Sequence, residues 1–377
     1  MKNTFETDVL IVGGGPSGSS TALSLLKYSD LKVTIIEQND LNAVRVGEQV
    51  NASVFDFLDY LGLSKNDFGN ECFLPGFGSY AAWGTSNLSA RHSVFSTQVD
   101  SYQLNRELFD LKLLEKAAEN GALVFPRTKA LEFIETENNW LVSLKHETKG
   151  DFSVKTKYLI DASGRQSHVG RKVGVNYSKH DDLVAVGAFL HFPDGRELAQ
   201  EILLETVEDG WWYIAALPSK QLVVSLFTDA SIVKEKQLQK VENWTEKLSQ
   251  TVHIKQKVDK AISKEKLWVR NAFSHTTISS DVPNFLAVGD AIASFDPISS
   301  MGIGFAMSSA CHAAKAVIEQ SLNPKAFEMY NKSIHPIFEN YLKTQNQFYH
   351  MEQRWSNSPF WKKRLVNSPI PSEHLMF

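Results

Sequence analysis

Three glycines near the start of the chain are spaced for binding a pyrophosphate. Gly13, Gly15 and Gly18 form a G-x-G-x-x-G turn that encloses Pro16 and Ser17 and follows a short apolar run. That β-branched run is typical of a parallel strand covered on both faces, and the leucines and alanines after the turn favour a helix. The first glycine permits the tight turn, the second lets the backbone approach a phosphate, and the third lets helix and strand pack closely. Free N–H groups at the start of the helix favour negative charge.

An acidic residue follows where a dinucleotide fold requires one. The run "KVTIIE" reads as a second strand and ends in Glu37, about 20 residues after the glycines. A carboxylate at that place holds the ribose hydroxyls of a dinucleotide. Strand, glycine turn, helix, strand and acid together therefore predict a dinucleotide site.

Further polar residues lie at the ends of the predicted apolar elements later in the chain. "RVGEQV" supplies Arg45 and Glu48, and the segment 102–124 reads as a helix carrying Arg106, followed by a strand. The strand before "DASGRQS" ends in Asp161, and Gly164 follows it. Surface salt bridges remain open as the alternative role of the two arginines.

A late segment mixes polar and helix-starting residues into an apolar run. "GDAIASFDPISSMGIGFAMSSA", residues 289–310, holds Asp290, Pro297, Gly302 and Gly304. A buried strand entering a helix has no need of that mixture. A plain turn aspartate is the alternative reading of Asp290.

These motifs together resemble the FAD-dependent monooxygenases of the para-hydroxybenzoate hydroxylase type. The resemblance is closer to the branch with the flavin-dependent halogenases and the geranylgeranyl reductases, and it covers residues 5 to about 320. It implies bound FAD, with Asp290 on the ribityl chain and the helix near Gly302 aimed at the pyrimidine end of the flavin, where a helix N-terminus stabilises negative charge. The cofactor residues that it implies are Gly13, Gly15, Pro16, Ser17, Gly18, Glu37, Arg45, Glu48, Arg106, Asp161, Gly164, Asp290, Pro297, Met301, Gly302 and Ile303.

The expected fold is α/β, with a Rossmann-like FAD-binding domain of the glutathione-reductase type, an inserted antiparallel-sheet substrate domain and C-terminal helices. Four strand-like runs between 181 and 228, joined by turn signals, predict the inserted sheet. We expect the FAD-binding domain in 1–80, 101–180 and 271–322, the substrate domain in 81–100 and 181–270, and a helical region in 323–377.

Composition excludes several classes of protein. The 377 residues carry a net charge of −4, without the basic patch of a nucleic-acid binder. The two cysteines, Cys72 and Cys311, have no metal-ligand or disulfide spacing and read as buried thiols, so no metal site is expected. No window approaches the roughly 18 apolar residues of a spanning helix, and acidic residues precede the short N-terminal apolar run, unlike a secretory signal. We therefore expect a cytoplasmic protein without membrane partners.

The C-terminal region shows an apolar stripe at helical spacing. Phe327, Tyr330, Ile334, Phe338, Tyr341 and Leu342 recur at spacings of three or four. Core packing is the main interpretation, and a docking surface for a partner is the alternative.

Hydroxylation is the preferred chemistry. The segment 49–91 has one lysine, Lys65 in a turn-like context, where a flavin halogenase needs a tunnel lysine, and the halogenase Trp-x-Trp-x-Ile-Pro signature is absent. No side chain is an obvious catalyst, so the expected contribution of the protein is to exclude water and to position the substrate.

Within the superfamily, the chain is most similar to the LodB/GoxB-like flavoproteins, which mature quinoprotein amino-acid oxidases. The resemblance implies oxygenation of a tryptophan side chain in a precursor protein during biogenesis of cysteine tryptophylquinone. Residues that could stack on a substrate ring are Trp83, Trp211, Trp212, Tyr213 and Phe295, with ordinary packing as the alternative for each.

Two other classes of function remain open. They are a monooxygenase or reductase acting on a small free molecule and a flavin-binding chaperone that does not turn over. Because the chain has one glycine fingerprint, NAD(P)H or another external reductant would act transiently, with O2 as co-substrate. The sequence leaves the oligomeric state open.

Overall fold

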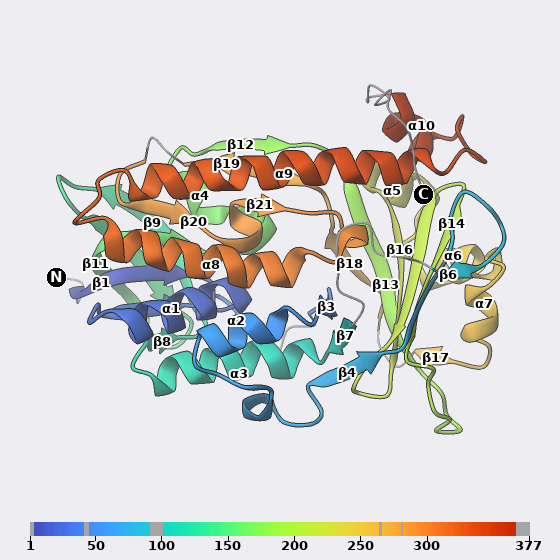
Figure 1. The fold of residues 1–377 in the computed structure, drawn as a ribbon, viewed down its shortest axis with the longest axis horizontal. Coiled ribbons are helices and arrows are strands. Elements are labelled where there is room, and N and C mark those ends of the chain that lie inside the picture. The colour runs from blue at the N-terminus through green and yellow to red at the C-terminus, as the bar shows by residue number, and fades with distance from the viewer. Residues whose placement is uncertain (1–3, 41–44, 91–100, 264–265, 280–281, 367–377) are drawn as a thin grey trace.

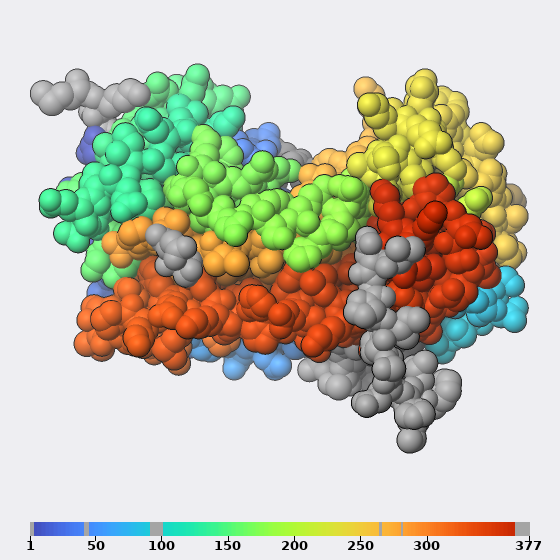
Figure 2. All heavy atoms as spheres, turned by 90° about the horizontal axis from the view of Figure 1, so that it is seen from above, coloured from blue at the N-terminus to red at the C-terminus, as the bar shows by residue number. Residues whose placement is uncertain are grey.

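The computed structural model describes residues 4–40, 45–90, 101–263, 266–279 and 282–366. Two lobes lie side by side along the long axis, each built on its own sheet (Figure 1). Viewed from above, the surface is hollowed between the lobes (Figure 2). The residues 91–100 and 367–377, parts of two expected domain segments, lie outside the described residues.

A seven-stranded sheet forms the first lobe, in the order β8-β2-β1-β11-β10-β9 with β20 beside β11. Its parallel part consists of β1 (Thr4–Val12), β2 (Val33–Ile36), β8 (Leu123–Phe125), β11 (Gly150–Asp161) and β20 (Phe285–Ala287), and β9 (Thr128–Glu135) and β10 (Trp140–His146) add an antiparallel hairpin. Val9, Leu10 and Ile11 of β1 are fully buried, as expected of a strand covered on both faces. The covering helices are α1 (Pro16–Tyr28), α3 (Arg106–Glu119) and α8 (Gly302–Glu319), and α1 packs against both others.

An eight-stranded sheet forms the second lobe, in the order β17-β13-β16-β15-β14-β5-β6 with β18 beside β13. Its strands are β5 (Gly78–Ala82), β6 (Ser89–Ala90), β13 (Leu183–His191), β14 (Glu201–Val207), β15 (Gly210–Ala216), β16 (Leu222–Asp229), β17 (Ile262–Ser263) and β18 (Trp268–Asn271). All pairings are antiparallel except that of β5 with β14. The predicted α/β fold with an inserted, mostly antiparallel sheet is therefore confirmed. The expected domain boundary at residue 80 falls inside β5.

Two small sheets and several short helices complete the fold. One small sheet consists of β3 (Gln49–Asn51), β4 (Phe73–Gly76) and β7 (Ser101–Leu104), and the other of β12 (Asn176–Lys179), β19 (His275–Ile278) and β21 (Ala293–Ser294). The short α-helices are α2 (Val54–Tyr60), α4 (His168–Lys172), α5 (Ala230–Lys236), α6 (Val241–Ser249) and α7 (Ile254–Lys257). The 3₁₀ helices are η1 (Lys65–Phe68), η2 (Gly164–Gln166), η3 (Gly289–Ala291) and η4 (Pro297–Ser299).

The C-terminal helices bind the lobes together. Helix α9 (Ala326–His350) runs along both lobes and leads to α10 (Pro359–Val366) on the second (Figure 1). Its predicted apolar stripe is buried from Phe327 to Tyr341, so the stripe is core and the alternative of a docking surface is wrong. No helix among the described residues is long and apolar enough to cross a membrane.

Candidate cofactor and active site

In the glycine turn after β1, a side chain would have room at one glycine and would clash with the backbone at two others. A Cβ at Gly13, where φ is +120°, would lie 2.2 Å from the carbonyl oxygen of Ala162, and one at Gly18 would lie 1.9 Å from that of Gly13. A Cβ at Gly15 would meet nothing within 4 Å, because it would point into a cavity. Gly18 therefore serves close packing and does not line the cavity, whereas Gly15 leaves room for a ligand at the start of α1.

Glu37 stabilises the glycine turn from the end of β2. The N–H of Gly14 donates to its Oε2 at 2.8 Å, and the N–H of Asn39 donates to its Oε1 at 2.9 Å. The carboxylate lines the cavity with 8% of its surface exposed. Nδ2 of Asn39 also donates to Oε1 at 3.0 Å, so Oε2 is the oxygen that retains a lone pair with which it can accept a ligand hydroxyl.

Arg45 and Arg106 meet on one buried carboxylate. Nη1 of Arg45 lies 2.5 Å from Oδ2 of Asp110, and Arg106 donates to both oxygens of Asp110, with Nε at 3.0 Å and Nη2 at 2.9 Å. Arg106 also donates to the carbonyls of Val46 and Gly47 at 2.6 and 3.0 Å. The arginines thus form partly buried ion pairs at the cavity wall, and the alternative of surface salt bridges is wrong. Asp110, which is 2% exposed, was not predicted, although it follows Arg106 at the helical spacing of four.

Glu48 is a buried acid beside these arginines. It is 5% exposed, it lines the cavity, and its Oε1 has no hydrogen-bond partner among the described residues. Burial raises the pKa of Glu48 from 4.5 to about 7, which backbone hydrogen bonds and the Arg106 guanidinium only partly offset. Near neutral pH a large share of this carboxyl is protonated, so it can donate as well as accept.

This pKa predicts a pH-dependent stability in flavin-free protein. The folded chain holds the proton more tightly than the unfolded chain, so the stabilisation is complete below pH 4.5 and is lost as the pH rises to about 7. Relative to Glu48→Gln, the free energy of unfolding of wild type should fall by about 3 kcal/mol across that window. Urea titrations at about pH 5 and about pH 8 measure it. The exposed Glu71→Gln control should show no such difference, and a wild type that runs parallel to Glu48→Gln would contradict the assignment.

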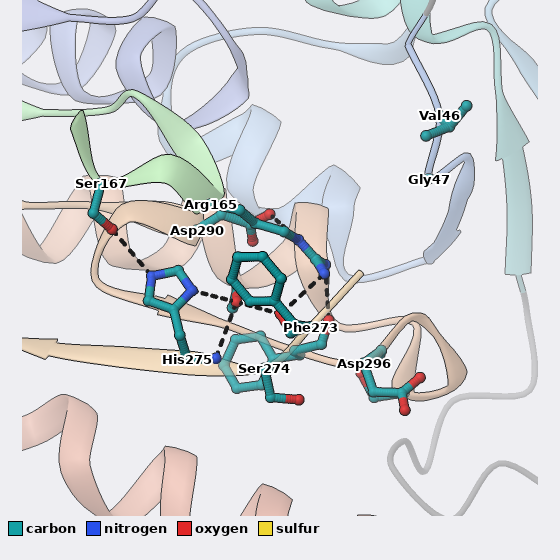
Figure 3. Close-up of polar contacts among 12 residues, drawn as sticks. Val46, Gly47, Arg165, Ser167, Phe273, Ser274, His275, Asp290 and Asp296 are labelled. Atoms are coloured by element: carbon teal, nitrogen blue, oxygen red, sulfur yellow. Dashed lines mark hydrogen bonds and ion pairs between the residues drawn. The ribbon is translucent and has the colours of Figure 1, made fainter. Parts of the chain in front are cut away.

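Asp290 lies on η3, which packs against α8 and η2. Its Oδ2 accepts from Nε of Arg165 at 3.0 Å, and Arg165 also donates to the carbonyls of Phe295 and Phe273, at 2.8 and 3.2 Å (Figure 3). Arg165 therefore holds the carboxylate and the backbone that follows it in one arrangement. Asp290 and Arg165 both line the cavity, but the sequence did not identify Arg165 as a site residue.

A buried histidine forms hydrogen bonds with residues that flank the Asp290 segment. The ring nitrogens of His275 lie 3.1 Å from the hydroxyl of Ser167 and 2.6 Å from that of Ser294 (Figure 3). Burial lowers the pKa of His275 to about 4, so the ring is neutral at physiological pH. Its hydrogen bonds tie β19 to the turn that follows η2 and to β21.

Three predicted cofactor residues lie outside the cavity: Gly18, which serves packing as described above, Asp161 and Met301. Asp161 is fully buried and accepts from the N–H groups of Ser163 and Gly170 at 2.9 and 2.8 Å, so it fixes the turn after β11. Met301 precedes α8 without lining the cavity, although its neighbours do. Asp161 was misassigned because a carboxylate that organises a turn and one that faces a ligand look alike in sequence.

One cavity of about 870 Å³ joins the two lobes. Of the predicted cofactor residues, it is lined by Gly13, Gly15, Pro16, Ser17, Glu37, Arg45, Glu48, Arg106, Gly164, Asp290, Pro297, Gly302 and Ile303. Its volume is in the range of cavities that hold cofactors and drug-sized ligands. Among the described residues, no cluster of three or more His, Cys, Asp or Glu could hold a metal ion.

Aromatic side chains line the far half of the cavity. Trp211, Tyr213 and Phe295 lie there as predicted, together with Phe227 and Trp268, which were not predicted. Two other predictions for this half are wrong, because Trp83 and Trp212 do not line the cavity. Trp83 donates to the carbonyl of Phe348 and packs on its ring at 4.4 Å. Trp212 is fully buried and packs against Trp244 at 5.1 Å, on the other face of the sheet.

The glycine turn, the acid on β2 and the Asp290 segment before α8, gathered around one cavity, define a flavoprotein oxidoreductase site. Residues 6–344 match the model of the FAD binding domain family, and the chain belongs to that family.

Known proteins share both the sequence and the fold. A putative FAD-dependent oxidoreductase of Marinomonas mediterranea, LodB, is 42% identical over 364 residues, which are 96% of this chain and 98% of LodB. The flavin-dependent halogenase CmlS superposes with a TM-score of 0.84 at 24% identity, over 97% of this chain and 68% of CmlS. The peptidyl tryptophan dihydroxylase QhpG, essential for tryptophylquinone cofactor biogenesis, superposes with a TM-score of 0.77 at 20% identity, over 98% of this chain and 81% of QhpG.

The residues around the cavity fit FAD. The open space at Gly15 suits a pyrophosphate against the N-terminus of α1. The Oε1 atom of Glu48 has no hydrogen-bond partner among the described residues, and a hydroxyl group of the cofactor would supply one. Helix α8 begins at Gly302 in the cavity wall, with no cap from the side chain that precedes it.

Proposed function

We propose that this flavin-dependent oxidoreductase is a monooxygenase that hydroxylates an electron-rich aromatic ring, a tryptophan side chain of a precursor protein during cysteine tryptophylquinone biogenesis. The observation that carries the proposal is the continuity of the cavity, which runs from the glycine turn to the aromatic face of the second lobe. Support comes from the 42% identity with LodB over nearly the whole of both chains and from the fold shared with a peptidyl tryptophan dihydroxylase.

Different parts of the cavity wall would hold different parts of FAD. The start of α1 and the turn around Gly15 would bind the pyrophosphate, and Glu37 would accept from the ribose hydroxyls. Asp290, oriented by Arg165, would accept from the ribityl hydroxyls. The N-terminus of α8 would stabilise negative charge on the flavin ring. When bound and reduced, FAD supplies the electrons that activate O2, with NAD(P)H or another external reductant as their source.

The contribution of the protein to the reaction is positioning and exclusion of water. The far half of the cavity presents Trp211, Tyr213 and Phe227 from neighbouring strands, and it would hold the substrate ring against the segment from Phe295 to Ile298. Apolar walls keep water from the reacting atoms. Glu48 is one of the lining acids, and its pKa of about 7 allows it to exchange a proton near neutral pH; burial also raises the pKa of Asp296.

The proposal is tested on a candidate precursor, the protein that co-purifies with this one. Purified FAD-loaded protein, reductant and O2 are incubated with the precursor, and the intact masses of the precursor and its tryptophan peptides are compared with a reaction lacking O2. We expect the mass of one or two oxygen atoms on a tryptophan. O2 uptake without a change in the precursor would favour a small free substrate, and a flavin that never reoxidises with product formation would favour a chaperone.

A further inference from the structure

The register of the second sheet lays out the cavity wall in two rows. Because side chains alternate between the faces of a strand, the residues paired across strands at the cavity share one face. The first row runs through Leu204, Tyr213, Ser225, Gly187 and Trp268, and the second through Trp211, Phe227, Ala185 and Arg270. All of them except Gly187 line the cavity.

Two small side chains interrupt this otherwise bulky wall. Ser225 and Ala185 lie at diagonal positions on β16 and β13 and are 2% and 3% exposed. A Cβ at Gly187 would lie 2.4 Å from Cζ2 of Trp268, so the indole of Trp268 covers the glycine and closes one side of the recess. Tyr213 closes the opposite side, because it is the partner of Ser225 on β15.

The recess has an aromatic third wall and faces the segment before α8. The ring of Phe227 stacks on Trp211 with centroids 4.0 Å apart and planes at 16°. Pro297 and Ile298, both on η4, line the same cavity. The indole of Trp268, whose Nε1 is buried, lines the cavity beside these residues.

We propose that Ser225 and Ala185, set between Tyr213 and Trp268, determine which ring the cavity accepts, by leaving a recess for the edge of a bicyclic aromatic ring such as indole. A larger side chain at either position fills the recess and leaves room for a single ring at most. This inference rests on the proposed function for its aromatic substrate, and it adds the residues that select that substrate.

The test compares the binding of two probes by FAD-loaded protein without turnover. N-acetyltryptophanamide and N-acetylphenylalaninamide are titrated by equilibrium dialysis against wild type and three variants. Ser225→Leu fills the recess, Ser225→Ala removes the hydroxyl without filling it, and Ser219→Leu makes the same chemical change in the exposed turn between β15 and β16.

Wild type, Ser225→Ala and Ser219→Leu should bind the indole probe more tightly than the phenyl probe. Ser225→Leu should bind the indole probe about tenfold more weakly, which is the effect of overfilling a packed site. Its affinity for the phenyl probe should change less, and its flavin content should stay that of wild type. A merely structural role of Ser225 would weaken both probes equally.

Equal binding of the indole probe by Ser225→Leu and Ser219→Leu, or no preference for indole in wild type, would overturn the inference. The outcome is separable from that of the precursor experiment. A preference for indole that Ser225→Leu abolishes supports the recess even where no oxygen is added to a precursor.

Discussion

A Gly15→Val variant is expected to fold and to purify without flavin. The backbone at Gly15 has φ −75° and ψ −172°, an extended conformation that a β-branched residue adopts readily. The valine side chain would occupy the open space beside the α1 N-terminus, where the phosphates would lie. Overlap of this kind and the loss of the phosphate contacts should weaken FAD binding by about 100-fold or more.

Two other glycines make the experiment discriminating. A Cβ at Gly18 would lie 1.9 Å from a backbone oxygen, so Gly18→Ala should fail to fold. A Cβ at Gly304 would meet nothing within 4 Å, and Gly304 does not line the cavity, so Gly304→Ala should keep both fold and flavin.

Flavin absorbance relative to protein absorbance gives the cofactor content, and urea unfolding gives the stability. Because valine is a poor residue at the position preceding a helix, Gly15→Val should lose about 1 kcal/mol of unfolding free energy. A yellow Gly15→Val protein with normal FAD content would refute the site.

The fold could be predicted because its signals are local. The glycine turn, the apolar run before it and the acid at the end of β2 are short patterns tied to one geometry, and the four strand-like runs between 181 and 228 became β13 to β16. The register between those strands could not be predicted. Register depends on contacts between distant residues, and it decides which side chains reach the cavity.

The two adjacent tryptophans show how far the sequence could predict which side chains line the cavity. Trp211 and Trp212 are neighbours in β15, and successive side chains of a strand point to opposite faces, so both could not line one cavity. The sequence gives no means of choosing between them, because each is surrounded by apolar residues. Trp268 was not predicted for a different reason: its place at the recess follows from the pairing of β18 with β13, a contact across about 80 residues.

The polar residues that support the site were also hidden. Arg165 and Asp290 are separated by 125 residues and meet only because η2 and η3 lie together in the fold. Motif residues such as Asp161 carry the same residue type whether they face a ligand or a turn. The sequence therefore identified residues near the site and could not separate those that contact a ligand from those that hold its walls.

The second large effect is expected from Asp110→Asn, which should destabilise the fold and weaken FAD binding together. Asp110 is the one carboxylate that accepts from both arginines in the described structure, and asparagine keeps its shape but not its charge. Two guanidinium groups, with side chains 16% and 13% exposed, then lose their counter-charge. Removing one partner of a buried ion pair costs about 3–5 kcal/mol, because the remaining charge stays desolvated.

The effect should reach the cofactor through the backbone. Arg106 donates to the carbonyls of Val46 and Gly47, so its displacement loosens the segment that presents Glu48 to the cavity. Glu115→Gln is the matched control, since Glu115 pairs with Lys112 on the same helix but is 43% exposed, and such surface pairs contribute about 0.5 kcal/mol or less. Urea unfolding and FAD titration on both variants measure the two effects. A loss of less than about 1 kcal/mol of unfolding free energy for Asp110→Asn would contradict this prediction. It would show that the arginines find other partners or that water reaches them.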